Sequence, residues 1–155
     1  MPNLEARLDR LGITIPEAPK PVASYVPSVA VHSGSLVFIS GQLPFEKGKL
    51  MATGRVPGQV SIETAQKCAR QCVVNGLAAL LGEIGSFERL RRVVRLGVFV
   101  NAGEGFAEQP KVGNGASDLL VELLGENGRH ARAAVGVSSL PLDAPVEIEF
   151  TFLVD

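Results

Sequence analysis

The chain has 155 residues, which suits one domain and leaves no room for a second of ordinary size. Hydrophobic residues make up 46% and charged residues 20%, a composition that excludes a disordered chain. Fifteen Lys and Arg against sixteen Asp and Glu give a formal charge of −1, so we do not expect nucleic acid as a partner. No apolar run reaches the ~20 residues that cross a bilayer, and the first residues lack the apolar core of a secretory signal. We therefore expect a cytoplasmic protein with no membrane partner.

The first twenty residues predict a short helix followed by a connector. Leu4, Leu8 and Leu11 recur at helical spacing, and Gly12 is a typical helix stop. Pro16, Pro19 and, just beyond residue 20, Pro21 fall within six residues, and because proline fixes φ and removes a donor, they favour an extended segment. We expect residues 1–20 to belong to a single domain that spans 1–155.

The rest of the chain predicts an α+β fold. Its order of elements favours one mainly antiparallel sheet with two long helices on the same face. The strand at 35–40 is almost wholly apolar, so we expect both of its faces to be covered. Segment 45–60 is predicted as loop or weak edge strand. The expected strands are 26–32, 35–40, 93–100, 131–138 and 146–154, and the expected long helices are 61–81, stopped by Gly82, and 109–124.

The helix at 61–81 carries a face of small residues, which would let it lie close to a sheet. Cys68 and Cys72 are on this helix, four residues apart. A metal pair would need two more ligands nearby, so we interpret both cysteines as small buried hydrophobic residues. The face comprises Ile62, Ala65, Ala69, Cys72, Gly76 and Ala79.

Arg132 and Glu147 are the most informative charged pair. If strands 131–138 and 146–154 form an antiparallel hairpin around Pro141–Pro145, these two residues are roughly opposite each other. An arginine can grip a carboxylate at two points, and a neighbouring glutamate could deprotonate a water molecule. Spacing alone favours the plainer alternative, a solvated cross-strand ion pair worth about 0.2–1 kcal/mol. Glu149 is an equally good candidate on the same face.

The two histidines give weaker signals. His32 ends a predicted strand and is expected to be an exposed turn residue. His130 precedes the strand that carries Arg132 and could reach a cleft, but no Ser or Cys can be paired with it by spacing. Histidine alone supports no catalytic triad.

Several short motifs, taken together, resemble a known family. They are Phe38-Ile39-Ser40-Gly41-Gln42-Leu43-Pro44, Val98-Phe99-Val100, Ala131-Arg132-Ala133-Ala134-Val135-Gly136-Val137, Leu140-Pro141 and Val146-Glu147-Ile148-Glu149. In this order and spacing the chain resembles the reactive intermediate deaminase (Rid) family, also called the YjgF or endoribonuclease L-PSP family, in a branch with an extra N-terminal helix. The resemblance implies a chorismate-mutase-like fold, a homotrimer with clefts between subunits, and no metal or organic cofactor.

The resemblance also implies roles for individual residues. Arg132 would bind the carboxylate of a small-molecule substrate, and Glu147 would position the attacking water. The chain departs from the family where Ala134 replaces a common cysteine, so that only its backbone could serve, and where His130 replaces a common proline. The other positions matched to the substrate cleft are Tyr25, Ser40, Gly41 and Asn114.

The function implied is hydrolytic deamination of enamines and imines of 2-oxo acids, which yields the oxo acid and ammonia. Under this hypothesis Arg132 orients the carboxylate, and Glu147, kept ionised by nearby positive charge, accepts a proton from water. An alternative is a non-catalytic binder of small carboxylate metabolites in the same clefts. A ribonuclease ranks last, because the near-neutral charge and single tyrosine offer little for gripping phosphates or stacking bases.

Overall fold

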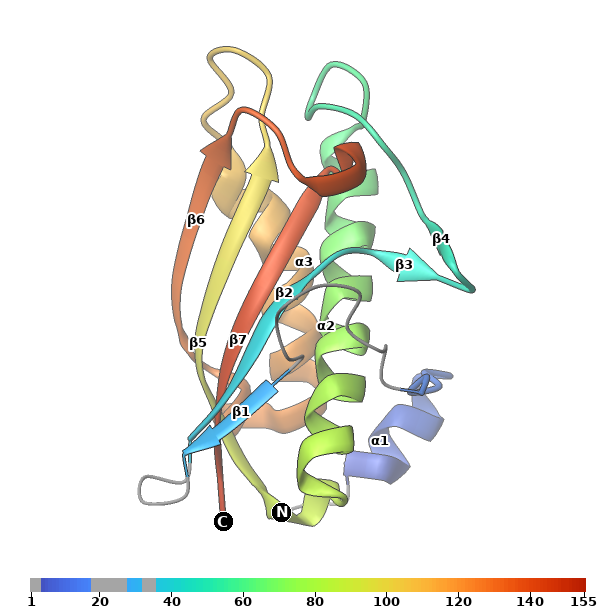
Figure 1. Ribbon diagram of the computed structural model, residues 1–155, viewed down its shortest axis with the longest axis vertical. Helices are drawn as coiled ribbons and strands as arrows, with labels where there is room; N and C mark the ends of the chain where they lie inside the picture. The colour runs from blue at the N-terminus through green and yellow to red at the C-terminus, as the bar shows by residue number, and fades with distance from the viewer. Residues whose placement is uncertain (1–3, 18–27, 32–35) are drawn as a thin grey trace.

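The computed structural model describes residues 4–17, 28–31 and 36–155 (Figure 1). One five-stranded sheet has the order β1-β2-β7-β5-β6, and two long helices lie side by side on one of its faces. Its strands are β1 (Ser28–Val31), β2 (Leu36–Gln42), β5 (Leu90–Asn101), β6 (Ala131–Val137) and β7 (Val146–Val154). The helices are α1 (Leu4–Arg10), α2 (Ile62–Ile84) and α3 (Gln109–Leu124), with 3₁₀ turns η1 (Phe87–Arg89), η2 (Gly125–Gly128) and η3 (Pro141–Asp143).

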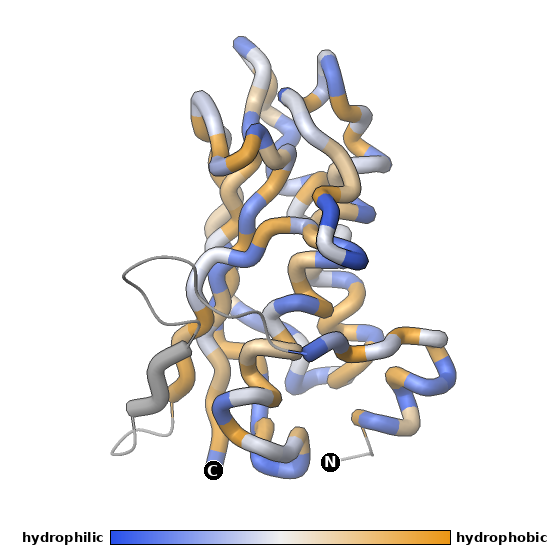
Figure 2. The backbone as a smooth tube through the Cα atoms, turned by 45° about the vertical axis from the view of Figure 1, so that its right-hand side comes forward, coloured by the Kyte–Doolittle hydropathy of each residue, from blue (hydrophilic) through white to orange (hydrophobic). Residues whose placement is uncertain are grey.

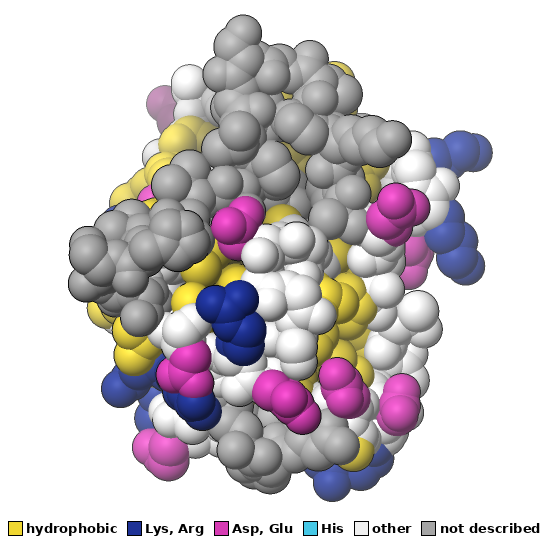
Figure 3. Space-filling model, turned by 60° about the horizontal axis from the view of Figure 1, so that its bottom comes forward, with side chains coloured by type: hydrophobic (Ala, Val, Ile, Leu, Met, Phe, Trp, Pro, Cys, Tyr) yellow, Lys and Arg dark blue, Asp and Glu magenta, His cyan; other side chains and the backbone are white. Residues whose placement is uncertain are grey.

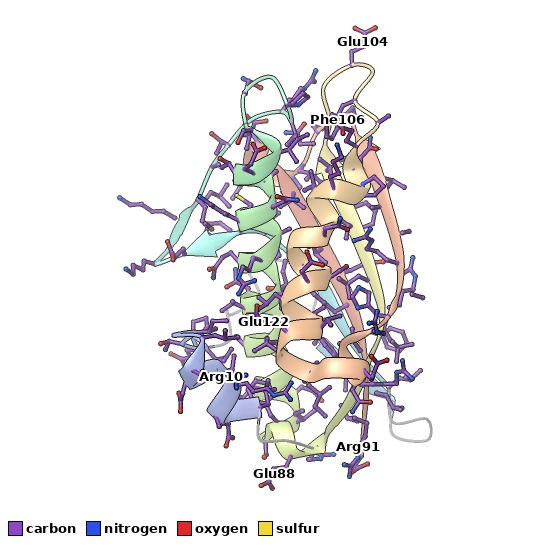
Figure 4. All side chains as sticks on the ribbon, turned by 180° about the vertical axis from the view of Figure 1, so that it is seen from behind. Arg10, Glu88, Arg91, Glu104, Phe106 and Glu122 are labelled. Atoms are coloured by element: carbon purple, nitrogen blue, oxygen red, sulfur yellow. The ribbon has the colours of Figure 1, made fainter. Side chains whose placement is uncertain are left out.

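This arrangement confirms the expected α+β fold. Strand β7 pairs antiparallel with β2 and β5, and β1 pairs antiparallel with β2. The exception is β6, which is parallel to β5 at the edge of the sheet. Seen from the helix side, α3 covers the part of the sheet that holds β5 and β6 (Figure 4).

The expected hairpin between the last two strands is wrong. Strand β5 lies between β6 and β7 and pairs with both of them. The short segment that joins β6 to β7 therefore crosses over β5 instead of closing a tight turn. Pairing within sheets is a non-local property, which strand patterns and turn residues along the chain do not determine.

Strand β7 alternates between a buried and a half-buried face. Every second residue from Val146 to Val154 is buried against the helices, and the residues between them lie on the opposite face of the sheet. The same alternation holds in β2, where Phe38 is 46% exposed. The expectation that both faces of this strand are covered is therefore wrong for the single chain, because the helices cover one face only. Figure 2 shows the resulting mixture of polar and apolar residues along the strands.

Helix α2 begins as expected and ends later than expected. The Ser61 side chain caps it by accepting from the backbone N–H of Thr64. The helix passes through Gly82 and ends at Gly85, which has φ of 74° and donates its N–H to the Leu81 carbonyl. A glycine within a helix is tolerated, whereas the left-handed conformation at the end favours one. None of the helices in the described segments is long and apolar enough to cross a bilayer.

The segment between β2 and α2 forms a small two-stranded sheet. Strands β3 (Phe45–Glu46) and β4 (Lys49–Leu50) pair with each other and stand apart from the main sheet in Figure 1. On α2, the Asn75 amide donates to the carbonyls of Leu43 and Phe45, which ties this segment to the helix.

Helix α1 packs against the C-terminal end of α3. Leu4 and Leu8 are buried, and the Arg7 guanidinium donates to the Leu123 carbonyl at 3.0 Å. Carbonyls in the last turn of a helix lack intrahelical partners, so this bond satisfies one of them. In its described part, the N-terminal segment thus packs against the helices.

We predict that replacing Gly76 with alanine destabilises the protein. A Cβ at this position of α2 would lie 2.7 Å from the Phe150 ring of β7, in the buried layer between helix and sheet. Overpacking of this kind costs about 1–3 kcal/mol, which denaturant unfolding measures.

The matched control is Gly58→Ala, since a Cβ there meets nothing within 4 Å. Equal unfolding free energies for the two variants would contradict the close packing of α2 on β7.

Candidate functional site

Arg132 lies against α3 on the helix side of the sheet. It is the second residue of edge strand β6 and is opposite Leu96 of β5. Its Nη1 donates to Asn114 Oδ1 and to Ser117 Oγ, both at 3.0 Å, and its Nη2 donates to the Pro110 carbonyl at 3.3 Å. The first three turns of α3 therefore fix the direction of the guanidinium.

Glycine at position 113 makes room for this arrangement. A Cβ on Gly113 would lie 3.1 Å from Nη1 and 3.3 Å from Cζ of Arg132. These separations are tighter than ordinary van der Waals contact, so a side chain here would push the guanidinium away from the helix.

The positive charge of Arg132 is oriented but not neutralised. All three of its acceptors are neutral oxygens, and it forms no ion pair with an acidic side chain of the described segments. The residue is also half-buried. A half-buried guanidinium without a carboxylate partner is suited to bind an anion from outside the chain.

Glu147 lies on the opposite face of the sheet. Its carboxylate rests directly over Gly41 in β2, in the space that a Cβ at position 41 would fill. Burial raises the pKa of Glu147 above its ordinary value of 4.5, and the charge of Glu149 raises it further. The expectation that nearby positive charge keeps Glu147 ionised is therefore wrong within one chain. Its raised pKa makes Glu147 a stronger base once it is ionised.

The structure separates the two candidate glutamates. Glu149 lies over Gly97 of β5 and forms an ion pair with Arg95 at 3.0 Å. Glu147 makes no ion pair or side-chain hydrogen bond with the described residues. Its carboxylate is thus available to a substrate or water, whereas that of Glu149 is engaged.

Arg132 and Glu147 do not meet within one chain. Arg132 shares a row of the sheet with Leu96 and Phe150 on the helix side, whereas Glu147 is opposite Phe99 on the other side. Both the expected joint site and the plainer alternative of a cross-strand ion pair depended on the hairpin, and neither holds in the single chain. The reason is that β5 intervenes and the alternation of β7 turns Glu147 away from the helices.

The remaining candidates divide between these two places. Asn114 accepts a hydrogen bond from Arg132. Ala134 is two residues after Arg132 in β6 and therefore lies on the same side of the strand. Ser40 and Gly41 lie on β2, where Gly41 contacts Glu147. Tyr25 and His32 lie outside the described residues.

Ser117 joins the candidate site through its contacts, and the sequence did not indicate it. It contacts both Arg132 and His130, and its Oγ lies 3.0 Å from His130 Nε2. The serine is in the third turn of α3 and the histidine follows η2, so no short motif joins them. A signal was available only in the helical spacing, which places Ser117 on the same face as Asn114.

The cysteines agree with their interpretation as core residues. Cys68 and Cys72 are both free and buried, and burial raises the pKa of the Cys68 thiol to about 11. Within the described segments, no group of three His, Cys, Asp or Glu could hold a metal ion.

The chain matches a family model over residues 5–152, and that family is described as "YjgF/chorismate_mutase-like, putative endoribonuclease". A relative from Trypanosoma cruzi, Protein TCP17, is 42% identical over 148 residues, which cover 95% of this chain and 91% of the relative. A 2-iminobutanoate/2-iminopropanoate deaminase from Dermatophagoides farinae is 28% identical over 92% of this chain and 95% of that protein.

A solved structure confirms the architecture. The crystal structure of an Agrobacterium tumefaciens protein of unknown function matches with a TM-score of 0.90 and 46% identity, over 98% of this chain and 92% of that one. Taken with the sheet order and the two helices on one face, these matches show that the chain belongs to the YjgF/Rid family and has its chorismate-mutase-like fold.

Proposed function

We propose that this protein hydrolyses reactive imines of 2-oxo acids to the oxo acid and ammonia. The observation that carries the proposal is the Arg132 guanidinium, which α3 orients through neutral acceptors and which has no acidic partner in the described segments. The similarity to a 2-iminobutanoate/2-iminopropanoate deaminase over most of both chains supports this substrate class.

Arg132 would bind the substrate carboxylate. Its charge and its planar array of donors suit a carboxylate gripped at two points, which fixes the imine carbon in one place. Orientation of this kind lowers the barrier to attack, because the freedom of the reacting groups is removed on binding. Asn114 contributes by holding the guanidinium at Nη1.

Glu147 would carry the protons. The water oxygen forms a bond to the imine carbon while the carboxylate accepts a water proton and passes it to the imine nitrogen. The carbinolamine then gives its hydroxyl proton to the same carboxylate, which returns it to the amino group. The C–N bond breaks, ammonia leaves, and Glu147 is again ionised.

Both residues can act on one substrate if the active site forms between copies of the chain. Here the face of the sheet that the helices do not cover is called the open face. Phe38 on β2 is 46% exposed and Val135 on β6 is 45% exposed, and Val135 lies on the open face. Strand β6 is also an edge of the sheet, and within the described segments no other strand pairs with its outer side. We propose a homotrimer in which the open face and this edge are covered, so that Arg132 of one copy lies near Glu147 of the next.

A ribonuclease is less well supported. Among the described residues at the end of the molecule shown in Figure 3, acidic and basic side chains are interspersed, and no extended basic patch gathers over the centre of that view. Phosphate binding depends on clustered Lys and Arg, so this face offers no track for RNA.

Replacing Arg132 with alanine should abolish most of the activity. Loss of this half-buried charged partner should cost about 2 kcal/mol of substrate and transition-state binding, the lower end of the range for buried charge pairs, and Arg132→Lys should restore only part of it. The assay generates the imine with an amino acid oxidase and traps the remainder with semicarbazide.

The control is Arg70→Ala, which removes an exposed arginine that pairs with Glu122 on the helix layer. A wild-type protein that does not lower trapping would contradict the deaminase proposal. If 2-oxobutanoate still raised the Tm, and only when Arg132 is present, a carboxylate binder would be the better description.

Activity should depend on pH through Glu147. The base must be ionised, so kcat/KM should rise about tenfold per pH unit up to the pKa of Glu147 and level off above it. Burial raises this pKa in the single chain, and the Arg132 charge of the next copy would act in the opposite direction. Glu147→Gln should remove this limb and lower the rate about 10²- to 10⁴-fold. Glu149→Gln serves as the comparison, because its carboxylate is held by Arg95. It should retain the limb and move it to lower pH, because the Glu149 charge that raises the pKa of Glu147 is removed.

Mixing two inactive variants tests whether the site is shared. In a co-refolded equimolar mixture of Arg132→Ala and Glu147→Gln chains, a site between copies regains both residues in about a quarter of cases. Activity should therefore return to about a quarter of the wild-type value, in a species that sedimentation shows to be trimeric. An inactive mixture of correctly assembled chains would mean that the two residues do not serve one site.

A further inference from the structure

A chain of hydrogen bonds connects the guanidinium of Arg132 to the backbone of η2. Ser117 Oγ lies 3.0 Å from Arg132 Nη1 and 3.0 Å from His130 Nε2. On the other side of the ring, His130 Nδ1 lies 2.6 Å from the Gly128 carbonyl oxygen. The imidazole thus connects η2 to α3, and Ser117 of α3 extends the connection to Arg132 of β6.

The chemistry of these groups fixes the direction of each bond. A carbonyl oxygen only accepts, so His130 Nδ1 carries the proton in its bond to Gly128. In the neutral ring Nε2 is then an acceptor, and the Ser117 hydroxyl donates to it. The Ser117 oxygen is left to accept from Arg132, which only donates. The neutral histidine therefore keeps the hydroxyl turned so that its lone pair faces the guanidinium.

We propose that Ser117 and His130 are positioning residues for Arg132: they hold the guanidinium ready for a carboxylate and couple carboxylate binding to protonation of His130. The inference rests on the proposed role of Arg132 in substrate binding. In this proposal Ser117 and His130 do not touch the substrate, and they affect its binding only by holding Arg132 in place.

The charges around His130 determine the sign of this coupling. Burial and the positive charge of Arg132 lower the pKa of His130 below 6.5, against the bond to Gly128, which raises it. Arg129 is ion-paired with Glu126, and Arg92 of β5 donates to the Arg129 carbonyl. From α3 the neighbours are the neutral Ser117 and, through Arg132, Asn114.

A carboxylate bound to Arg132 would offset the charge that opposes protonation of His130. Binding should then raise the pKa of His130, and by reciprocity the affinity for a carboxylate should increase as the pH falls below neutrality. A purely structural hydrogen bond would not respond to the ligand in this way.

The first measurement compares Ser117→Ala with Ser117→Thr, which keeps a hydroxyl. Titration calorimetry with 2-oxobutanoate should show about tenfold weaker binding for the alanine variant, because one hydrogen bond to a charged group is lost. Threonine should restore most of the affinity. In the imine assay the alanine variant should raise KM more than it lowers kcat, and thermal unfolding checks that both variants are folded.

The second measurement is NMR of the imidazole nitrogens. The chain has two histidines, so His130→Gln identifies the signals of His130. We expect the Nδ1–H tautomer in the free protein, and a pKa that rises on addition of 2-oxobutanoate in wild type but not in Arg132→Ala.

The outcomes separate this inference from the proposed function. Weaker binding by Ser117→Ala together with the ligand-dependent His130 shift supports the inference, even if no imine is hydrolysed and the enzyme proposal fails. Unchanged affinity in Ser117→Ala, or a His130 pKa that ignores the ligand, overturns the inference while leaving the deaminase proposal intact. A wild-type protein that does not bind 2-oxobutanoate overturns the inference, and the imine-trapping assay then decides the deaminase proposal separately.

Discussion

Helices α2 and α3 cover one face of the five-stranded sheet, and this one-sided packing decides which side chains of the candidate site face away from the core. The buried residues of β7 and β2 point toward the helices, so the alternating residues between them, Glu147 and Phe38 among them, lie on the other face. Close contacts between helix and sheet, such as Gly76 against Phe150, leave no room to repack the layer. The position of each charged side chain is therefore set by the core beneath it.

The two charged residues central to the proposed chemistry have very different surroundings. Arg132 lies at the sheet edge against α3, where three neutral oxygens fix its direction without cancelling its charge. Glu147 lies over Gly41, where burial and Glu149 favour its protonated form. Each residue thus lacks an opposite charge among the described residues of its own chain. A substrate carboxylate would pair with Arg132, and an active site between copies of the chain would bring Glu147 of a neighbouring copy close to that substrate.

Glycines have a direct part in both halves of this arrangement. Gly41 leaves the space that the Glu147 carboxylate occupies, and Gly113 lets Arg132 approach α3. Gly97 does the same for Glu149, whose ion pair with Arg95 distinguishes it from Glu147. The charged side chains of the proposed site are therefore placed partly by positions that carry no side chain.

The sequence by itself determined the elements, because the helical and alternating patterns of α2, α3 and β7 reflect burial, which acts residue by residue. It also indicated Arg132, Glu147 and Asn114 through motifs that resemble the family. Only the tertiary structure decided that β5 separates β6 from β7, that Arg132 and Glu147 face opposite sides, and that Ser117 connects Arg132 to His130. Strand order and contacts between distant segments arise from how whole layers pack, and no local pattern along the chain encodes them.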